Sequence, residues 1–366
     1  MSKDIAQPDP FLPPSAGGCL PVTREIEGIP GDDLTLPGEF TLGLVLVLVL
    51  VLAAEFVNGW TDAPNAIATV VSTRVLSPRK AIVMATALNI AGAFSGTAVA
   101  ATIGTGIVDA SVINLTTVAA AMVALVFWST FAARFGLPTS ESHALVAGLA
   151  GAGLAVAGPA VLLWAGWEKV IIGLAFSTFL GFLGGWGITI AINKVFGHSQ
   201  RRGTREIFGR LQLLSAAFMA FGHGSNDGQK FIGAFVLALV IGGILPSFQI
   251  PFWVVLLCSV MMGIGTSTGG WRIIRTMGMR MVKLAPYQGF AAETGAASVI
   301  QAASVFGIPL STTHTINTSI MGVGTVKGFS AVRWGVVRQV ILAWVLTFPI
   351  CGAISWGIAT LALRIL

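Results

Sequence analysis

Long apolar stretches recur along this chain of 366 residues and constrain its fold more than any other feature. A helix needs about 20 apolar residues to cross the roughly 30 Å hydrocarbon core of a bilayer. Stretches close to that length cover approximately residues 41–57, 81–103, 115–133, 170–192, 252–264 with its flanks, and 340–363. Hydrophobic residues make up 55% of the chain and charged residues only 10%, which is not the composition of a soluble globular domain. The sequence therefore predicts an all-α polytopic membrane protein.

The cysteines and the net charge exclude other classes of protein. Cys19, Cys258 and Cys351 show no paired spacing, so the sequence indicates neither a disulfide framework nor a metal site built on cysteine. The chain carries 21 basic and 15 acidic residues, but basic residues of a membrane protein gather in cytoplasmic loops for topological reasons. We therefore expect the lipid bilayer as a partner, and no nucleic acid.

Most basic residues cluster in four loops, at residues 74–80, 194–210, 272–283 and 327–338. The positive-inside rule makes these loops cytoplasmic. This topology gives each half of the chain about five net crossings and places both termini outside the cell (inner) membrane. Residues 1–39 are acidic and rich in proline, so we expect a loosely ordered tail there. The tail lacks the order of a signal peptide, and the apolar run after it is expected to be a retained first span.

Two motifs occur twice, in the same order in both halves. The segment FGLPTSESHALVAGLAGAG at residues 135–153 overlies FGIPLSTTHTINTSIMGVG at residues 306–324, at a constant shift of 171 residues. The segment NGWTDAPNAIAT, from Asn58, overlies HGSNDGQKFIGA, from His223, at a shift of 165 residues. Because each copy makes an odd number of crossings, the second copy must enter the membrane from the opposite side. The sequence thus predicts two inverted repeats, a plan typical of secondary transporters.

The predicted organisation follows from these repeats. It comprises an acidic tail at 1–39, a first inverted repeat at 40–192, a basic cytoplasmic loop at 193–210 and a second inverted repeat at 211–366. Interrupted helices and re-entrant hairpins are expected within the repeats, since transporters of this plan bind substrate near the midplane on discontinuous helices. Duplicated halves also occur in channels, so the fold alone does not decide the function.

Five acidic residues are expected at membrane depth, after the others are assigned to loops or to the tail. They are Glu55, Asp62, Glu141, Asp227 and Glu293. A charge at that depth costs from about 3 kcal/mol upward, so it usually faces a polar cavity and marks the path of an ion or a substrate. We interpret all five as candidates for cation or proton coupling. For Glu55 and Glu293 the alternative is an interfacial carboxylate.

The first motif pair places Asp62 and Asp227 beside glycines and amide side chains inside apolar helices. The amides are Asn58, Asn65, Asn226 and Gln229. Such helices are expected to break there, and Pro64 further favours an interruption. A break frees backbone groups, which are tolerated at membrane depth only where they line a cavity. Carboxylate, amide and carbonyl oxygens suit sodium at Asp62 and Asp227, whereas a lone carboxylate can carry a proton. The residues do not choose between these ions.

The second motif pair offers hydroxyl groups at a predicted helix start. The hydroxyl residues are Thr139, Ser140 and Ser142 in the first copy and Ser311, Thr312 and Thr313 in the second. Free amides at a helix N-terminus attract an oxyanion together with the helix dipole, and short hydroxyl side chains add donors. The alternative is that these residues only cap the helix. Two matched copies in inverted halves favour a substrate site.

If the two hydroxyl clusters face each other across a pseudo-twofold axis, they form a hydroxyl-lined cage beside Asp62 and Asp227. Gln229 is expected to be a further substrate contact. A carboxylate beside an oxyanion is repulsive unless a cation lies between them or the anion donates a proton. Protonated phosphate can donate, whereas sulfate at neutral pH cannot, so phosphate is the better candidate.

Two kinds of basic side chain have more than one interpretation from the residues alone. Lys230 either pairs with Asp227, touches the anion, or extends to the membrane interface. His143 and His314 either relay protons or form hydrogen bonds between helices. The sequence does not decide between these roles.

Several of these segments resemble signatures of the inorganic phosphate transporter (PiT) family, in its bacterial low-affinity branch. They are EFVNGWTDAPNAIATVVSTRVLSPRKA, GLPTSESHAL, FGHGSNDGQKFIG, GTSTGGWRIIRTMG and GIPLSTTHTI. The match runs from about residue 55 to residue 334 and is specific, because several long motifs follow in the right order. The resemblance implies a symporter of inorganic phosphate and a cation, often a homodimer, with no cofactor. It also implies cation and substrate binding around Asp62 and Asp227. Phosphate would be held by Ser140, Ser311, Thr312 and Thr313.

The resemblance leaves the coupling ion open, and the chain departs from the family pattern in places. Bacterial relatives are generally regarded as proton-coupled and as able to take up neutral complexes of phosphate with a divalent metal, whereas other branches use sodium. Thr61 precedes Asp62 where relatives often have histidine, and Pro64 stands where a small residue is usual. Glu141 occupies a place that is commonly serine, which makes it a candidate for an added proton or cation site.

Three other functions are weaker alternatives. A passive ion channel would need a continuous polar lining, whereas the polar residues here cluster at two depths. An enzyme is not expected, because neither half assembles a nucleophile, a base and an orienting residue. A transporter of sulfate or another oxyanion is the closest competitor.

Overall fold

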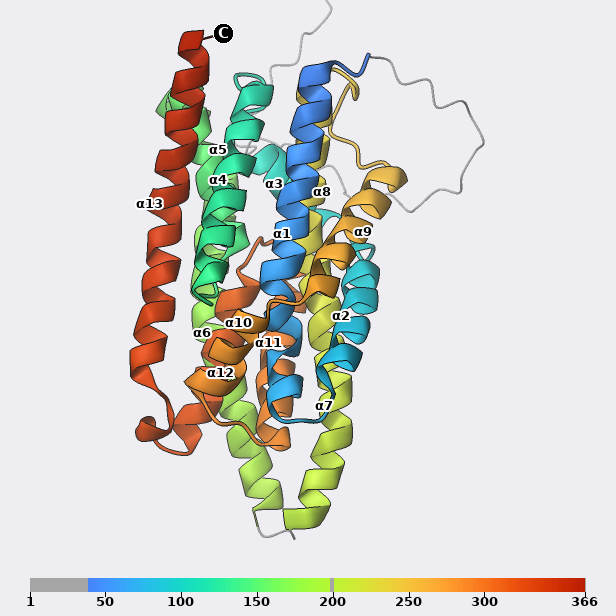
Figure 1. The fold of residues 1–366 in the computed structure, drawn as a ribbon, viewed down its shortest axis with the longest axis vertical. Helices are drawn as coiled ribbons and strands as arrows, with labels where there is room; N and C mark the ends of the chain where they lie inside the picture. Colours follow the sequence, from blue (N-terminus) through green and yellow to red (C-terminus); the bar gives the residue numbers. More distant parts are fainter. Residues whose placement is uncertain (1–38, 198–200, 366) are drawn as a thin grey trace, which may run out of the picture. The chain divides into compact units, whose positions relative to one another are not determined.

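The computed structural model describes residues 39–197 and 201–365, and within these ranges the chain is helical and has no strands (Figure 1). The first half contains α1 (Leu42–Ser72), α2 (Pro78–Ala93), α3 (Ala98–Gly106), α4 (Leu115–Arg134), α5 (Glu141–Ala157), the short η1 (Pro159–Val161) and α6 (Trp164–Phe196). The second half contains α7 (Arg201–His223), η2 (Gly224–Gly228), α8 (Gln229–Ile241), α9 (Phe252–Thr268), α10 (Trp271–Arg275), η3 (Thr276–Met281), α11 (Pro286–Val305), α12 (Thr312–Val326), η4 (Phe329–Ala331) and α13 (Trp334–Ile365). The tail predicted at 1–39 lies outside the described residues, apart from its last residue.

Several described helices are suited to a membrane. By length and composition α1, α4, α6 and α13 can each cross one, and two bent pairs pass the same test together. The pair α2–α3 bends by 67°, and α9 bends by 60° against the segment Trp271–Met281. Large apolar side chains such as Phe179 and Val345 are more than half exposed, as expected where lipid replaces water. The predicted polytopic all-α fold with interrupted helices is confirmed, whereas about five net crossings per half stays a prediction.

The two halves repeat the same order of helices in opposite directions (Figure 1). In this view α1 descends, whereas the path through α7, η2 and α8 ascends. Likewise α6 descends and α13 ascends. The start of α1 and the end of α13 therefore lie at the same end of the helical bundle. This arrangement confirms the two inverted repeats predicted from the sequence.

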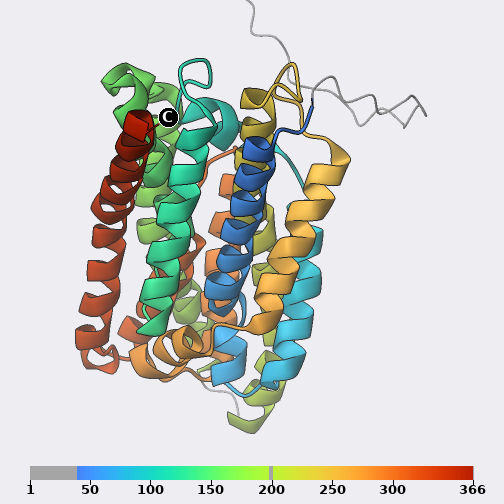
Figure 2. The same cartoon turned by 45° about the horizontal axis from the view of Figure 1, so that its top comes forward.

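Each half contains a helical hairpin, α4–α5 in the first and α11–α12 in the second. The chain turns at Gly136 and Gly307, whose φ angles of 69° and 64° lie in the left-handed region that favours glycine. The shift of 171 residues pairs these glycines, and Pro138 and Pro309 follow at matched positions. Figure 1 shows the two hairpins entering the bundle from opposite ends. Figure 2 keeps α13, α4, α1 and α9 in one row, and neighbouring helices of this row are in contact.

The second arm of each hairpin packs on the last helix of the other half: α5 lies against α13, and α12 lies against α6. Glycines permit this close approach. A β-carbon at Gly151 would lie 2.2 Å from the carbonyl oxygen of Gly352, and one at Gly322 would lie 2.2 Å from that of Phe182. Small residues at such contacts are typical of packed membrane helices. The two halves are therefore interlocked.

One expected interruption does not occur. α1 continues through Asp62 and Pro64 as a single helix of 31 residues, so the predicted break at the first acidic motif is wrong. Proline removes the donor that the carbonyl of Trp60 would otherwise receive, but buried packing on both sides of Pro64 holds the helix together. The second acidic motif does interrupt the regular helix, because Gly224–Gly228 forms the π-helical turn η2.

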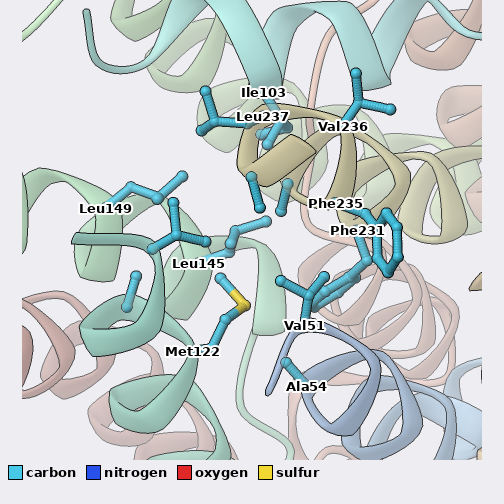
Figure 3. Packing of buried hydrophobic residues seen from close by; sticks show 14 of the residues in the cluster. Val51, Ala54, Ile103, Met122, Leu145, Leu149, Phe231, Phe235, Val236 and Leu237 are labelled. Atoms are coloured by element: carbon cyan, nitrogen blue, oxygen red, sulfur yellow. The ribbon is translucent and has the colours of Figure 1, made fainter. Parts of the chain in front are cut away.

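Two apolar cores lie on either side of the acidic motif of α1. The first core includes α1 residues from Leu44 to Ala54 and residues of α3, α4, α5 and α8. Figure 3 shows part of it, with Val51 of α1 beside Phe231 of α8. The second core begins on α1 at Ala66 and includes residues of α2, α7, α11 and α12. The polar residues between Ala54 and Ala66 are thus held in a layer between two cores.

Candidate substrate and cation site

The start of α12 lies between the two acidic motifs. Thr313 Oγ1 donates to Asp62, at 3.2 Å from Oδ1 and 3.4 Å from Oδ2. Thr312 Oγ1 donates to Asp227 Oδ2 at 2.5 Å. Asn65 of α1 donates its amide to Thr313 Oγ1 at 2.9 Å and to Thr312 Oγ1 at 3.3 Å. All five side chains are buried. The structure thus brings together both predicted acids and two predicted hydroxyl groups from distant parts of the chain.

The helix starts at both hairpin tips follow from local sequence. Ser140 is the N-cap of α5 and accepts the backbone N–H of His143 at 3.3 Å. Ser311 is the N-cap of α12 and accepts the backbone N–H of His314 at 3.2 Å. Both serines therefore fill the capping role that the sequence left open for them. The helix dipoles bring partial positive charge to these tips, where Thr139 is also buried.

The first hairpin meets the second through Ser142 and meets α1 through Glu141. Ser142 Oγ donates to the carbonyl oxygen of Leu310, in the tip of the second hairpin, at 3.0 Å. Glu141 Oε1 accepts a hydrogen bond from Thr61 Oγ1 at 2.6 Å, which holds the carboxylate beside Asp62. The two hairpin tips and α1 thus converge on the same buried layer.

Lys230 lies at this junction and is 1% exposed. Its ammonium forms an ion pair with Asp227 and donates to Ser142 Oγ at 2.5 Å and to the carbonyl oxygen of Leu310 at 2.7 Å. Pairing with Asp227 is therefore the interpretation that the structure shows, and extension to the membrane interface is wrong. A buried charge of this kind is tolerated because it is paired and hydrogen-bonded.

His223 is a residue of this layer that the sequence reasoning missed. Its Nε2 lies 3.1 Å from Asp227 Oδ2 and 4.0 Å from Asp62 Oδ2, and its Nδ1 lies 3.3 Å from Asn89 Oδ1. Ligand atoms of Asp62, His223 and Asp227 all lie within 4.8 Å of one another, close enough to share a metal ion. The signal was present: His223 opens the second copy of the acidic motif, four residues before Asp227 on a helical path.

Three further predicted residues surround the layer. Asn58 donates its amide to Glu55 Oε2 at 3.1 Å, so these two lie together on α1. Asn226 donates to Ser304 Oγ at 3.0 Å and to the carbonyl oxygen of Ile308 at 3.2 Å. These bonds fix η2 to the second hairpin.

Two predicted residues are occupied elsewhere. Gln229 accepts the backbone N–H of Val99 at 3.0 Å and donates to the carbonyl oxygen of Ser225 at 2.6 Å, so both ends of its amide bind backbone. Glu293 belongs to a separate buried cluster: it accepts hydrogen bonds from Thr69 Oγ1 at 2.5 Å, from Gln212 Nε2 at 3.1 Å and from Ser215. The structure therefore joins neither residue directly to the hydroxyl cluster.

The two motif histidines pack against each other and against aromatic rings. The ring centroids of His143 and His314 lie 4.6 Å apart, and His314 stacks on Trp344 at 3.8 Å. His143 lies 4.7 Å from Phe348. The indole of Trp344 donates to the carbonyl oxygen of Pro138 at 2.9 Å. His314 Nδ1 also lies 2.6 Å from Ser311 Oγ, so this histidine combines ring packing with a hydrogen bond at the helix start.

The layer contains buried acceptor atoms that have no hydrogen-bond partner among the described residues. They are Oε1 of Glu55, Oε2 of Glu141 and the amide oxygens of Asn58, Asn65 and Asn226. Buried polar atoms are rarely left without a partner. Carboxylate and amide oxygens are ligands that suit a hard cation. The residues present therefore fit a cation better than a further hydrogen-bonding network.

Fold and site together define a membrane protein of inverted repeats that buries acids and hydroxyl groups where its halves meet, an arrangement typical of secondary transporters. The sequence pattern of the phosphate transporter family matches this chain twice, at residues 58–204 and 196–355. The chain belongs to that family, which confirms the resemblance seen in its signatures.

Two bacterial relatives agree with this assignment, and one solved structure shares the fold. A probable low-affinity inorganic phosphate transporter of Rhizobium meliloti is 42% identical over 325 residues, which are 88% of this chain and 96% of that protein. A protein of the same description from Bacillus subtilis is 38% identical over 320 residues, which are 86% of this chain and 96% of that protein. A solved structure titled "The sodium-dependent phosphate transporter" shares the fold with a TM-score of 0.80 at 23% identity. The structural match covers 89% of this chain and 100% of the chain in the solved structure.

Proposed function

We propose that this protein carries inorganic phosphate across the cell (inner) membrane in symport with a cation, by alternating access to the layer at the hairpin tips. The observation that carries the proposal is the start of α12, where Thr312 contacts Asp227 and Thr313 contacts Asp62. The descriptions of the two bacterial relatives name the same substrate, inorganic phosphate.

Phosphate binds at the hairpin tips because donors concentrate there. The hydroxyl groups of Ser142, Thr312 and Thr313 donate to it, and Thr139, Ser140 and Ser311 lie at the same helix starts. A hydroxyl group can rotate away from a carboxylate toward the anion. The P–OH group of monoprotonated phosphate then donates a hydrogen bond to the carboxylate that the hydroxyl group no longer contacts. Sulfate has no proton at neutral pH and meets that carboxylate with repulsion.

The coupling cation, a proton or sodium, binds among the acceptor oxygens of the same layer. Asp62 and Asp227 lie at its centre with Asn65, Asn226 and Glu141. Glu55, beside the amide of Asn58 on α1, and Glu293 of α11, which accepts a hydrogen bond from Thr69 of α1, are further buried carboxylates that extend the polar path. A neutral complex of phosphate with a divalent metal is a second form in which this site accommodates the substrate. No cofactor is needed for such a cycle.

Alternating access requires the hairpin tips to separate from one another. The contact between Ser142 and Leu310 and the ring contact between His143 and His314 join the tips. Opening these contacts toward one end of the bundle exposes the layer to that side, while an apolar core remains closed on the other side. Because the halves are inverted, the opposite opening uses equivalent elements.

Orientation and assembly complete the proposal. The turn between α1 and α2, the lower ends of α6 and α7, and the turn before α13 lie at one end of the bundle, opposite the start of α1 (Figure 1). Basic residues concentrate in these connections, so this end faces the cytoplasm and both termini lie outside. We further propose a homodimer, as the resemblance to the family implies.

Uptake of labelled phosphate into proteoliposomes tests the function. We expect accumulation under an imposed proton or sodium gradient, each applied separately, with excess sulfate as a poor competitor. Mere equilibration of phosphate, unaffected by either gradient, would indicate a passive channel, and equal inhibition by sulfate would indicate a general oxyanion transporter.

A pair of variants on α12 tests the site. Thr313→Val removes a hydroxyl group at the acids, whereas Thr325→Val removes one that donates to the carbonyl oxygen of Gly322 within the same helix. A hydrogen bond to a charged group contributes about 1.5–3 kcal/mol, so Thr313→Val should lower kcat/KM for phosphate about tenfold or more. Thr325→Val should leave it within about twofold on the same scale. Equal effects of the two variants would contradict the placement of substrate.

A further inference from the structure

The two copies of the acidic motif differ in the charge that flanks the aspartate. The shift of 165 residues that pairs Asp62 with Asp227 also pairs Asn65 with Lys230 and Asn58 with His223. At both flanking positions the first half has a neutral amide and the second half has a basic side chain. The two aspartates therefore occupy matched positions of the repeat but have differently charged neighbours.

Lys230 occupies a set of ligands of the kind that binds a monovalent cation. Its ammonium contacts a carboxylate of Asp227, the hydroxyl of Ser142 and the carbonyl oxygen of Leu310. Carboxylate, hydroxyl and carbonyl oxygens are also the ligands that hard cations take in proteins. The ammonium is buried. It is a cation that belongs to the protein itself and cannot exchange with solution.

The first half leaves the corresponding place without a built-in charge. Asn65 donates its amide to Thr312 and Thr313, and its Oδ1 has no hydrogen-bond partner among the described residues. Asp62 accepts long hydrogen bonds from Thr313 and lies 4.0 Å from the imidazole of His223, and no lysine or arginine forms an ion pair with it among the described residues. Asp227, in contrast, is contacted by Lys230, His223 and Thr312. The other titratable neighbours of Asp62 are Glu141 and Asp227, which are both acids.

We propose that the Lys230 ammonium is a tethered substitute for a transported cation, so that the second half binds no exchangeable ion and the coupling cation binds at Asp62. This inference rests on the proposed function and narrows its cation site from two aspartates to one. Lys230 then determines how many cations the protein binds. A chain of this fold with a neutral amide at both positions would bind one cation more per transport cycle.

The sharpest test copies the first half into the second by replacing Lys230 with the asparagine found at its repeat position. It is made in an Asp62→Asn background, so that any sodium effect must come from the second half. The full-length protein in detergent is unfolded by heat in sodium chloride and in choline chloride, each at about 100 mM. A ligand that binds only the folded state raises its unfolding temperature. We expect Asp62→Asn/Lys230→Asn to unfold at a higher temperature in sodium, and Asp62→Asn alone to show no difference.

Matched controls separate ligand binding from simple loss of charge. Lys230→Met in the same background removes the ammonium without supplying an oxygen, so sodium should not stabilise it. Adding Asp227→Asn to the double variant should remove the sodium effect. The inference is overturned if sodium already stabilises Asp62→Asn, or if it fails to stabilise the folded double variant.

A second measurement covers a double variant that does not fold. Equilibrium binding of radioactive sodium to Lys230→Asn is compared with binding to the unaltered protein, and one more sodium ion per chain is expected; equal numbers overturn the inference. Neither readout involves phosphate movement. Failure of phosphate uptake in proteoliposomes would therefore contradict the proposed function without affecting this test.

Discussion

The first and second halves of the molecule carry the same motifs in the same order, yet their side chains contact different partners. The hydroxyl groups of the second hairpin bind both aspartates, whereas the first hairpin binds Thr61 through Glu141 and the second hairpin tip through Ser142. The shift of 171 residues pairs Glu141 with Thr312 and Ser142 with Thr313. Matched motifs have therefore produced an asymmetric arrangement, in which the hydroxyl groups of the second hairpin contact both aspartates and the first hairpin contacts Thr61 and the second hairpin tip.

The largest difference between the halves is expected from the aspartates. Asp62→Asn and Asp227→Asn should both reduce phosphate accumulation in proteoliposomes to background. Only Asp227→Asn leaves a buried lysine without its ion-pair partner, a change that typically costs about 3–5 kcal/mol. Its unfolding temperature in detergent should therefore fall clearly below that of Asp62→Asn. Equal unfolding temperatures would show that the ion pair with Lys230 contributes nothing, and full accumulation in either variant would show that its carboxylate is not needed.

An intermediate difference is expected between the hairpins. Ser142→Ala removes one neutral hydrogen bond to Leu310 and one acceptor for Lys230, and a net loss of about 1 kcal/mol corresponds to roughly a fivefold rise in the KM for phosphate. This is smaller than the effect expected for Thr313→Val. Measuring both variants in the same uptake assay sharpens the comparison. A larger effect for Ser142→Ala would reverse the roles assigned to the two hairpins.

The smallest effect on transport is expected at Gln229, whose repeat position in the first half is Pro64. Gln229→Ala removes hydrogen bonds to the backbone of Val99 and Ser225, so the start of α3 should lose about 1 kcal/mol of stability. The KM for phosphate should change by less than about twofold on this scale. Uptake kinetics and thermal unfolding measure the two quantities. A tenfold rise in KM with unchanged stability would instead support Gln229 as a substrate contact.

Much of the fold could be predicted because its signals are large. Apolar runs and the two motif repeats indicated the helices and their inversion. The continuity of α1 through Pro64 could not be predicted, because it depends on tertiary packing around the carbonyl of Trp60 rather than on local sequence. Gly270 lies there: a β-carbon at that position would be 2.9 Å from this carbonyl oxygen.

The site was predictable where the repeat supplied matched residues. Asp62, Asp227, Thr312 and Thr313 meet as expected, because both motifs recur and inverted halves must converge. Glu293 has no acidic counterpart at its repeat position, and the sequence could not show that α11 directs it toward Gln212 and Thr69. His223 was not predicted as a site residue because histidine is counted as neutral among charged residues, although it opens the second copy of the acidic motif.

The exchange of partners between hairpins and last helices has a consequence for movement. α5 packs on α13, and α12 packs on α6, through close glycine contacts. A displacement of either hairpin would therefore also move the last helix of the other half. Each packed unit of hairpin and last helix therefore combines parts of both halves of the chain. Each half therefore depends on the other for the packing of its hairpin.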